Sequence, residues 1–160
     1  MEEEKIEISL SVNGSRVTKT VPVRRHLVDF LRLDMELTGS HLACEHGVCG
    51  ACTVRVDGAA VRGCLMLAAQ ADGAEVVTIE GLSDSGEVAD LQAEFELRNA
   101  AQCGYCTPGM IITSAELLAA GGIPDRDTIR DHLSGNLCRC TGYQAIVDAV
   151  EQTMKKRAAT

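Results

Sequence analysis

The chain has 160 residues, with 23 acidic and 15 basic side chains that give a net charge of −8. This length allows one or two small domains, and an acidic surface repels phosphate backbones, so nucleic acid is not an expected partner. No apolar run approaches the roughly 20 residues of a membrane-spanning helix. The opening stretch MEEEKIEISL also lacks the basic and apolar segments of a signal peptide. We therefore expect a cytoplasmic protein without a membrane span.

The first half of the chain carries the signals of two β-hairpins and one helix. Residues 6–21 alternate apolar and polar side chains on both sides of an Asn-Gly pair, and residues 53–61 do the same around an Asp-Gly pair. A helix is expected over residues 26–35, where apolar side chains recur on one face, and a further strand over residues 75–79. These elements predict a small α+β domain with its helix packed on one face of the sheet.

The second half reads as helical. A polar, Gly- and Ser-rich segment at residues 80–87 predicts a linker, which divides the chain into domains at residues 1–82 and 83–160. Thr107 is the expected N-cap of one helix, with Pro108 at its first position. The four predicted helices span residues 88–98, 108–120, 125–133 and 143–154. They predict a small helical bundle.

Eight cysteines are the most informative residues of the chain. They fall into two sets of four, which are Cys44, Cys49, Cys52 and Cys64, and then Cys103, Cys106, Cys138 and Cys140. Disulfides are reduced in the cytoplasm, so a cysteine-dense cytoplasmic chain is expected to bind metal. Buried structural cysteines have no reason to cluster in this way.

The first set has the spacing of a plant-type 2Fe–2S ferredoxin loop. Four residues separate Cys44 from Cys49, two separate Cys49 from Cys52, and Cys64 follows later in the chain. Three ligands on one tightly wound loop suit a compact anionic cluster, whereas zinc sites usually combine two short cysteine pairs. His46 lies inside the loop, but a Rieske centre needs two histidine ligands.

The second set allows more than one reading by spacing alone. Cys103 and Cys106 form a Cys-x-x-Cys pair, but no strand signal precedes them as in a thioredoxin-like redox site. Cys138 and Cys140 form a second pair, so structural zinc remains an alternative to an iron–sulfur cluster. Each pair precedes a predicted helix start, where free N–H groups would face an anionic centre.

Three longer motifs resemble the iron–sulfur subunit of molybdenum hydroxylases, the family of xanthine dehydrogenase and carbon monoxide dehydrogenase. They are TGSHLACEHGVCGACTV (residues 38–54), QCGYCTPGM (residues 102–110) and NLCRCTGY (residues 136–143). The motifs occur in the family's order and span almost the whole chain. Ala43 stands where the family usually has Gly, and Tyr105 where Phe is common, but neither change removes a ligand.

The resemblance implies a fold and a set of partners. It implies an N-terminal β-grasp, ferredoxin-like domain and a C-terminal four-helix domain, each holding one 2Fe–2S cluster through its four cysteines. It further implies that Gln102 and Cys140 approach a molybdopterin cofactor on a large partner subunit. A medium FAD-binding subunit and an (αβγ)2 assembly are also expected. The implied role is to pass electrons from the molybdenum centre towards the flavin, with no catalytic residue in this chain.

Two other functions are compatible with parts of the pattern. A free ferredoxin-like carrier would suit the acidic charge, although the helical half argues against it. A zinc-stabilised interaction module would use the same cysteines without redox chemistry. Neither alternative accounts for all three motifs.

Overall fold

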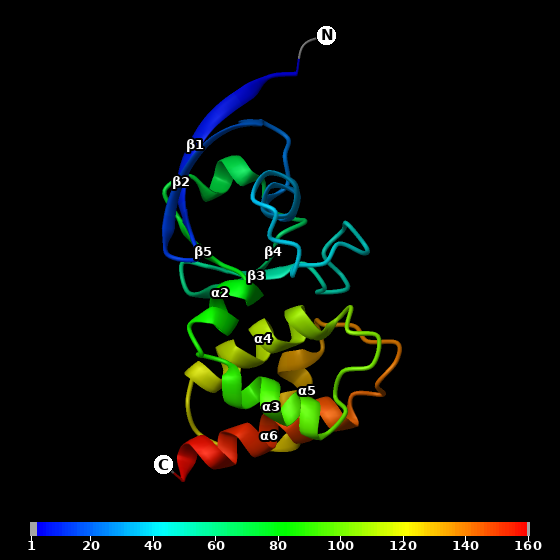
Figure 1. The fold of residues 1–160 in the computed structure, drawn as a ribbon. Helices are drawn as coiled ribbons and strands as arrows, with labels where there is room; N and C mark the ends of the chain where they lie inside the picture. Colours follow the sequence, from blue (N-terminus) through cyan, green and yellow to red (C-terminus); the bar gives the residue numbers. More distant parts are fainter. Residues whose placement is uncertain (1–2, 160) are drawn as a thin grey trace.

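Two lobes lie end to end in the computed structural model, which describes residues 3–159 (Figure 1). The N-terminal lobe contains a five-stranded mixed sheet with the strand order β2-β1-β5-β3-β4. Its strands are β1 (Lys5–Val12), β2 (Ser15–Pro22), β3 (Thr53–Val56), β4 (Ala59–Arg62) and β5 (Glu75–Val77). The protein is therefore of mixed α and β structure, with the sheet confined to the first half.

Both predicted hairpins are confirmed. Strands β1 and β2 pair antiparallel across the Asn-Gly turn, and β3 and β4 pair antiparallel across the Asp-Gly turn. Asn13 and Asp57 have positive φ angles of 49° and 48°, which such two-residue turns require. The short strand β5 joins the hairpins, because it runs parallel to β1 and antiparallel to β3.

One helical segment covers the sheet, as predicted. Helix α1 (Leu27–Asp29) continues directly into the wider π-helical turn η1 (Phe30–Asp34), and a 3-10 turn, η2 (Ala68–Ala71), lies beside it. Phe30 is fully buried among aliphatic side chains of the sheet. This core lies between the sheet and the segment formed by α1, η1 and η2.

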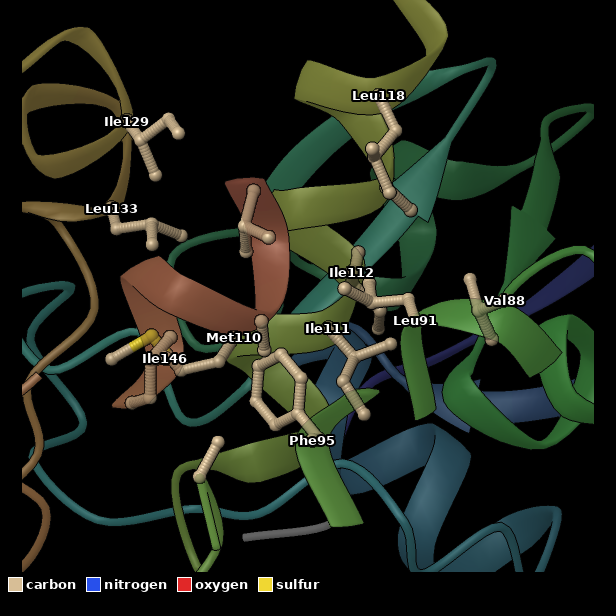
Figure 2. Close-up of a cluster of buried hydrophobic side chains, with 14 of the residues drawn as sticks. Val88, Leu91, Phe95, Met110, Ile111, Ile112, Leu118, Ile129, Leu133 and Ile146 are labelled. Carbon is tan, nitrogen blue, oxygen red and sulfur yellow. The ribbon is translucent and has the colours of Figure 1, made fainter. Parts of the chain in front are cut away.

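The C-terminal lobe contains five helices between residues 78 and 159. They are α2 (Ile79–Asp84), α3 (Ala89–Leu97), α4 (Thr107–Ala119), α5 (Arg126–Leu133) and α6 (Gln144–Ala158). Figure 2 shows how Phe95, Met110, Ile112 and Ile146 from three of these helices meet in one apolar core. Helices α3 to α6 correspond to the four helices that the sequence predicts, with boundaries that shift by a few residues.

Two local predictions in this half were wrong. The expected linker at residues 80–87 is largely helix α2, because Ile79 and Leu82 are buried in the helical core and fix this turn against it. Thr107 is the first residue of α4 rather than its N-cap, and Cys106 takes the N-cap position. The Thr107 N–H already bonds the Gly104 carbonyl (3.2 Å), so the turn before the helix leads straight into it.

Helix α4 lies at the junction of the two lobes (Figure 1) and packs against β3 and β4 as well as against α5. Glu116 on this helix accepts a hydrogen bond from the backbone N–H of Ala60 in β4 (2.8 Å). Near its N-terminus, a β-carbon added to Gly109 would lie only 2.2 Å from the carbonyl oxygen of Gly50. The helix therefore approaches the loop before β3 as closely as a backbone can.

None of the helices between residues 3 and 159 has the length and apolar character needed to cross a lipid bilayer.

The contact at Gly109 generates a prediction about stability. Gly→Ala inside a helix normally stabilises it by about 0.5–1 kcal/mol. In Gly109→Ala the added methyl group would overlap Gly50, so we expect destabilisation of about 1–3 kcal/mol, the cost of overpacking a tight contact. Denaturant unfolding followed by circular dichroism measures the change. A variant that is more stable than the wild type would show that the lobes are not in this close contact.

Candidate iron–sulfur sites and the contact between them

The first cysteine set lies at the edge of the N-terminal lobe. Cys44, Cys49 and Cys52 are on the loop that leads into β3, and Cys64 follows β4. Cys52 and Cys64 are buried at 1% and 2% exposure, whereas Cys44 and Cys49 are half-buried. The β3–β4 hairpin thus brings the distant fourth cysteine to the inner end of the loop.

Left-handed backbone conformations wind this loop. Glu45, Gly47 and Gly50 have φ angles of 58°, 84° and 73°. A β-carbon at Gly47 would lie 2.4 Å from the side chain of Leu65, and one at Gly50 would lie 2.7 Å from the Gly135 carbonyl. Glycine is therefore required at the latter two positions by both conformation and space.

The thiols of the first set sit in two different environments. The backbone N–H of Cys49 points at the Cys44 sulfur (3.4 Å) and, with that of His46, lowers the pKa of Cys44 to about 6. Burial raises the pKa of Cys52 to about 11. The outer end of the loop stabilises a thiolate by hydrogen bonds, whereas the inner end would need bound metal to keep one.

The second set comes from two segments of the helical lobe. Cys103 and Cys106 precede α4, and Cys138 and Cys140 lie between α5 and α6. All four line one cavity of about 200 Å³. Cys49 of the first set lines the same cavity. The structure therefore brings together residues that the sequence separates by more than thirty positions, and it places the two sets next to each other.

Neighbouring groups shift the pKa values of the second set. Burial raises the pKa of Cys106 to about 12. Burial also acts to raise that of Cys138, but hydrogen bonds from Thr141 outweigh it and the pKa is lowered. The Thr141 hydroxyl donates to the Cys138 sulfur at 3.0 Å. The side chain of Cys103 raises the pKa of Cys140. These couplings show that the thiols face one another.

The donor chemistry of both sets fits iron–sulfur clusters. All eight cysteines are free thiols. Among the described His, Cys, Asp and Glu residues, no group of three or more is arranged to hold a single metal ion. A 2Fe–2S cluster divides four thiolates between two irons, so it does not require three side chains to converge on one ion. His46 is exposed, and its Nδ1 contacts the Cys44 carbonyl.

A pair of stacked aromatic rings joins the segment before the first ligand loop to the segment that carries Cys103 and Cys106. His41, before the first loop, stacks on Tyr105, between Cys103 and Cys106, with ring centroids 4.5 Å apart. The Tyr105 hydroxyl donates to the Leu42 carbonyl (2.6 Å), and His41 Nδ1 lies 2.8 Å from the Tyr105 carbonyl. Sequence reasoning noted Tyr105 only as a departure from the family and did not single out His41.

The backbone provides a shorter link. The N–H of Leu137 donates to the Cys49 carbonyl (2.8 Å). Leu137 directly precedes Cys138, so one hydrogen bond joins a residue of the first set to the neighbour of a residue of the second. No local sequence signal indicates this contact.

The expected pterin-contacting positions lie on the surface. Gln102 and Cys140 are both exposed, and the cavity lined by Cys140 opens beside them. Leu137 and Tyr105 are 49% and 46% exposed around the same cavity. These side chains are available to a partner molecule.

Comparisons with known proteins agree with the cysteine chemistry. A family model described as a 2Fe-2S iron-sulfur cluster binding domain matches residues 10–79, and one described as a 2Fe-2S binding domain matches residues 78–151. The nicotine 6-hydroxylase small subunit of Paenarthrobacter nicotinovorans is 54% identical over 92% of this chain and 88% of that protein. The caffeine dehydrogenase subunit gamma of Pseudomonas sp. (strain CBB1) is 48% identical over 90% and 88%.

A solved structure is similar over nearly its whole length. A chain in the crystal structure of quinoline 2-oxidoreductase from Pseudomonas putida 86 matches with a TM-score of 0.91 and 45% identity. The match covers 97% of this chain and 96% of that chain.

The ligand segments of the second set have little regular structure, so we expect metal binding there to hold the helical lobe together. Cys106→Ser should lose iron from the second site and reduce both helicity and protease resistance of residues 83–160. Cys44→Ser is the matched control, because it should lose iron from the first site while the helical lobe stays resistant. Iron analysis, circular dichroism and limited proteolysis measure these effects. Full helicity in an iron-depleted Cys106→Ser variant would contradict the coupling.

Proposed function

This chain belongs to the xanthine dehydrogenase family of molybdenum hydroxylases as a small iron–sulfur subunit, and from this premise we propose how its residues carry electrons. It is the electron-transfer subunit of a multi-subunit oxidoreductase and contains two 2Fe–2S binding domains. The observation that supports the mechanism is the cavity lined by all four cysteines of the second set and by Cys49, because electron transfer between two centres requires them to be close.

We propose that the first cluster is held by Cys44, Cys49, Cys52 and Cys64, and the second by Cys103, Cys106, Cys138 and Cys140. When bound, each cluster supplies a one-electron acceptor and donor. Burial of Cys52, Cys64 and Cys106 excludes water from the inner side of each site. The Cys49 N–H donates to the sulfur of Cys44, and the Thr141 hydroxyl donates to the sulfur of Cys138. Both hydrogen bonds stabilise negative charge on sulfur and so tune the reduction potential of the bound cluster.

The route between the sites follows the Leu137–Cys49 hydrogen bond. It joins the main chain of Cys49 to that of Leu137, which precedes Cys138. The route therefore consists of covalent bonds and one hydrogen bond, with no step through empty space. The aromatic pair of His41 and Tyr105 links the region of the first ligand loop to the other ligand segment of the second set, residues 103–106.

We propose that the second cluster faces the molybdenum cofactor and the first faces the flavin. Gln102 and Cys140 would contact the pterin, and their exposure beside the second site supports this order. A glutamine amide both donates and accepts hydrogen bonds, which suits a pterin edge rich in both kinds of group.

The remaining parts of the proposal concern the assembly. The large partner subunit would hold the molybdopterin cofactor, a medium subunit would hold FAD, and the complex would be an (αβγ)2 assembly in the cytoplasm. Within this chain we propose a β-grasp domain at residues 1–82 and a four-helix domain, α3 to α6, within residues 83–160. Nicotine, caffeine and quinoline are nitrogen heterocycles, so we propose a substrate of this class for the complex, bound outside this chain.

The cluster assignment is tested by composition and spectroscopy of the native protein. We expect two 2Fe–2S clusters, seen as four irons and four labile sulfides per chain and as two distinct EPR signals after reduction, because each set provides the four thiolates of one cluster. Bound zinc, or half of the expected iron with one signal, would overturn the assignment.

The order of the clusters is tested at Gln102. In the purified complex, Gln102→Ala should weaken cofactor retention or slow the reduction of both clusters by substrate, because the amide that contacts the pterin is lost. Both cluster spectra should remain nearly intact. Gln92→Ala, which removes from α3 a half-buried glutamine that donates a hydrogen bond to Ser83, is the control and should behave like the wild type. Single-turnover reduction measures the rate.

The opposite order predicts a different result. In that case substrate would reduce the clusters of Gln102→Ala at the wild-type rate. Val48→Asp, beside Cys49, would instead slow electron transfer from molybdenum to the clusters, and this pair of results would show that the first cluster faces the pterin.

A further inference from the structure

Resting on the proposed two-cluster function, we propose that Asn136 is a positioning residue that sets the separation between the clusters. Asn136 lies two residues before Cys138, and its side chain reaches the first ligand loop at Gly50, which lies between Cys49 and Cys52. A side chain carried by the segment that leads into the second site thus contacts the main chain of the first.

Asn136 is a buried polar residue at 1% exposure, and both the nitrogen and the oxygen of its amide are hydrogen-bonded. Its Nδ2 donates to the carbonyl of Gly50 at 3.3 Å. Its Oδ1 accepts from the hydroxyl of Thr113 on α4 at 3.1 Å and from Nη2 of Arg62 on β4 at 3.2 Å. Four segments of the chain therefore meet at one amide group, and both lobes contribute to it.

The residues on either side of Asn136 reinforce the same junction. The carbonyl of Gly135 accepts a hydrogen bond from Arg62 Nη2 at 2.7 Å, and the N–H of Leu137 donates to the Cys49 carbonyl at 2.8 Å. Three consecutive residues thus bond to the N-terminal lobe immediately before Cys138. A displacement of this segment would move the second site relative to the first.

The junction has no free space to absorb a displacement. A β-carbon on Gly50 would lie 2.8 Å from the amide carbon of Asn136, and one on Gly109 would lie 3.2 Å from its Nδ2. Both glycines allow backbone to approach the amide directly. A change in the position of the Asn136 amide is therefore expected to change the spacing of the two loops.

The amide chemistry makes Asn136 testable by a nearly isosteric change. In Asn136→Asp the two donors, Thr113 and Arg62, would still face an oxygen. The other carboxylate oxygen would face the Gly50 carbonyl, so an attractive contact would become a repulsive one. The Arg62 guanidinium would offset the buried charge, so the fold should be kept. The expected result is a shift of the Gly50 loop away from residues 135–137.

Two observables depend steeply on the distance between clusters. The magnetic interaction between two reduced, paramagnetic clusters decreases as they separate, and so does the rate of electron tunnelling. Neither depends directly on the stability of the fold. Both can therefore distinguish a positioning role from a merely structural one.

The experiment compares Asn136→Asp with Asn13→Asp in the purified native complex. Asn13 is a suitable control because the nitrogen and oxygen of its amide also bond a residue distant in sequence, Thr78, which belongs to neither ligand loop. We expect Asn136→Asp to keep wild-type iron and sulfide, to lose the splitting of the EPR signals caused by coupling between the clusters, and to slow transfer between them. Asn13→Asp should match the wild type in all of these.

Several outcomes would overturn the proposal. Unchanged coupling and transfer in Asn136→Asp, with or without a lower melting temperature, would assign the residue a structural role only. Absence of coupling in the wild type with both clusters present would show that they are not held close. If Asn136→Asp loses iron, Thr113→Val is used as the test variant instead. The proposal then requires Thr113→Val to weaken the magnetic coupling between the clusters. Absence of two clusters in the wild type would instead refute the proposed function.

Discussion

The hydrogen bonds that the carbonyl groups of Cys49 and Gly50 accept from residues 136 and 137 are the interaction on which the rest of the arrangement depends. Both carbonyls lie at the junction of the lobes, and Gly50 is buried, so its carbonyl needs donors from the protein. Thr53 donates to the Gly50 carbonyl from within the first lobe, and the donors from the other lobe belong to the segment that leads into Cys138. The same hydrogen bonds therefore fix the conformation of the first ligand loop and the position of the second cysteine set. The glycines at positions 50 and 109 are needed because a side chain at either position would prevent this close approach.

Each lobe combines a buried apolar core with ligand segments that contain little helix or strand, and the need to hold thiolates inside the protein explains this combination. A thiol that burial pushes to a pKa of about 11 or 12, as at Cys52 and Cys106, is a poor thiolate until positive metal is bound. At these two positions the charged thiolate is therefore stable only with the cofactor in place. This couples metal binding to the order of the ligand loops and, in the helical lobe, to the packing of the short helices that these loops connect.

Local and repetitive features could be predicted from the sequence, and long-range contacts could not. The hairpins follow from Asn-Gly and Asp-Gly turns, and the grouping of the cysteines follows from their spacing, because both signals lie within a few residues. Helix α2 was missed because its segment is polar and Gly-rich, and only its packing on the helical core makes it a helix. The bond from Asn136 to Gly50 spans 86 residues, and the stack of His41 on Tyr105 spans 64, so no local pattern could indicate either contact.

The two sites differ in how completely this chain encloses them. The first set has two fully buried cysteines, whereas Cys103 and Cys140 of the second set are exposed and their cavity is rimmed by the apolar surfaces of Leu137 and Tyr105. Solvent access raises the local dielectric and changes the potential of an iron–sulfur centre. A carrier that works alone would leave its second centre in contact with water. In the complex proposed above, a partner chain would cover that side and so take part in setting the potential. The uneven burial therefore fits a fixed electron-transfer subunit better than a free ferredoxin.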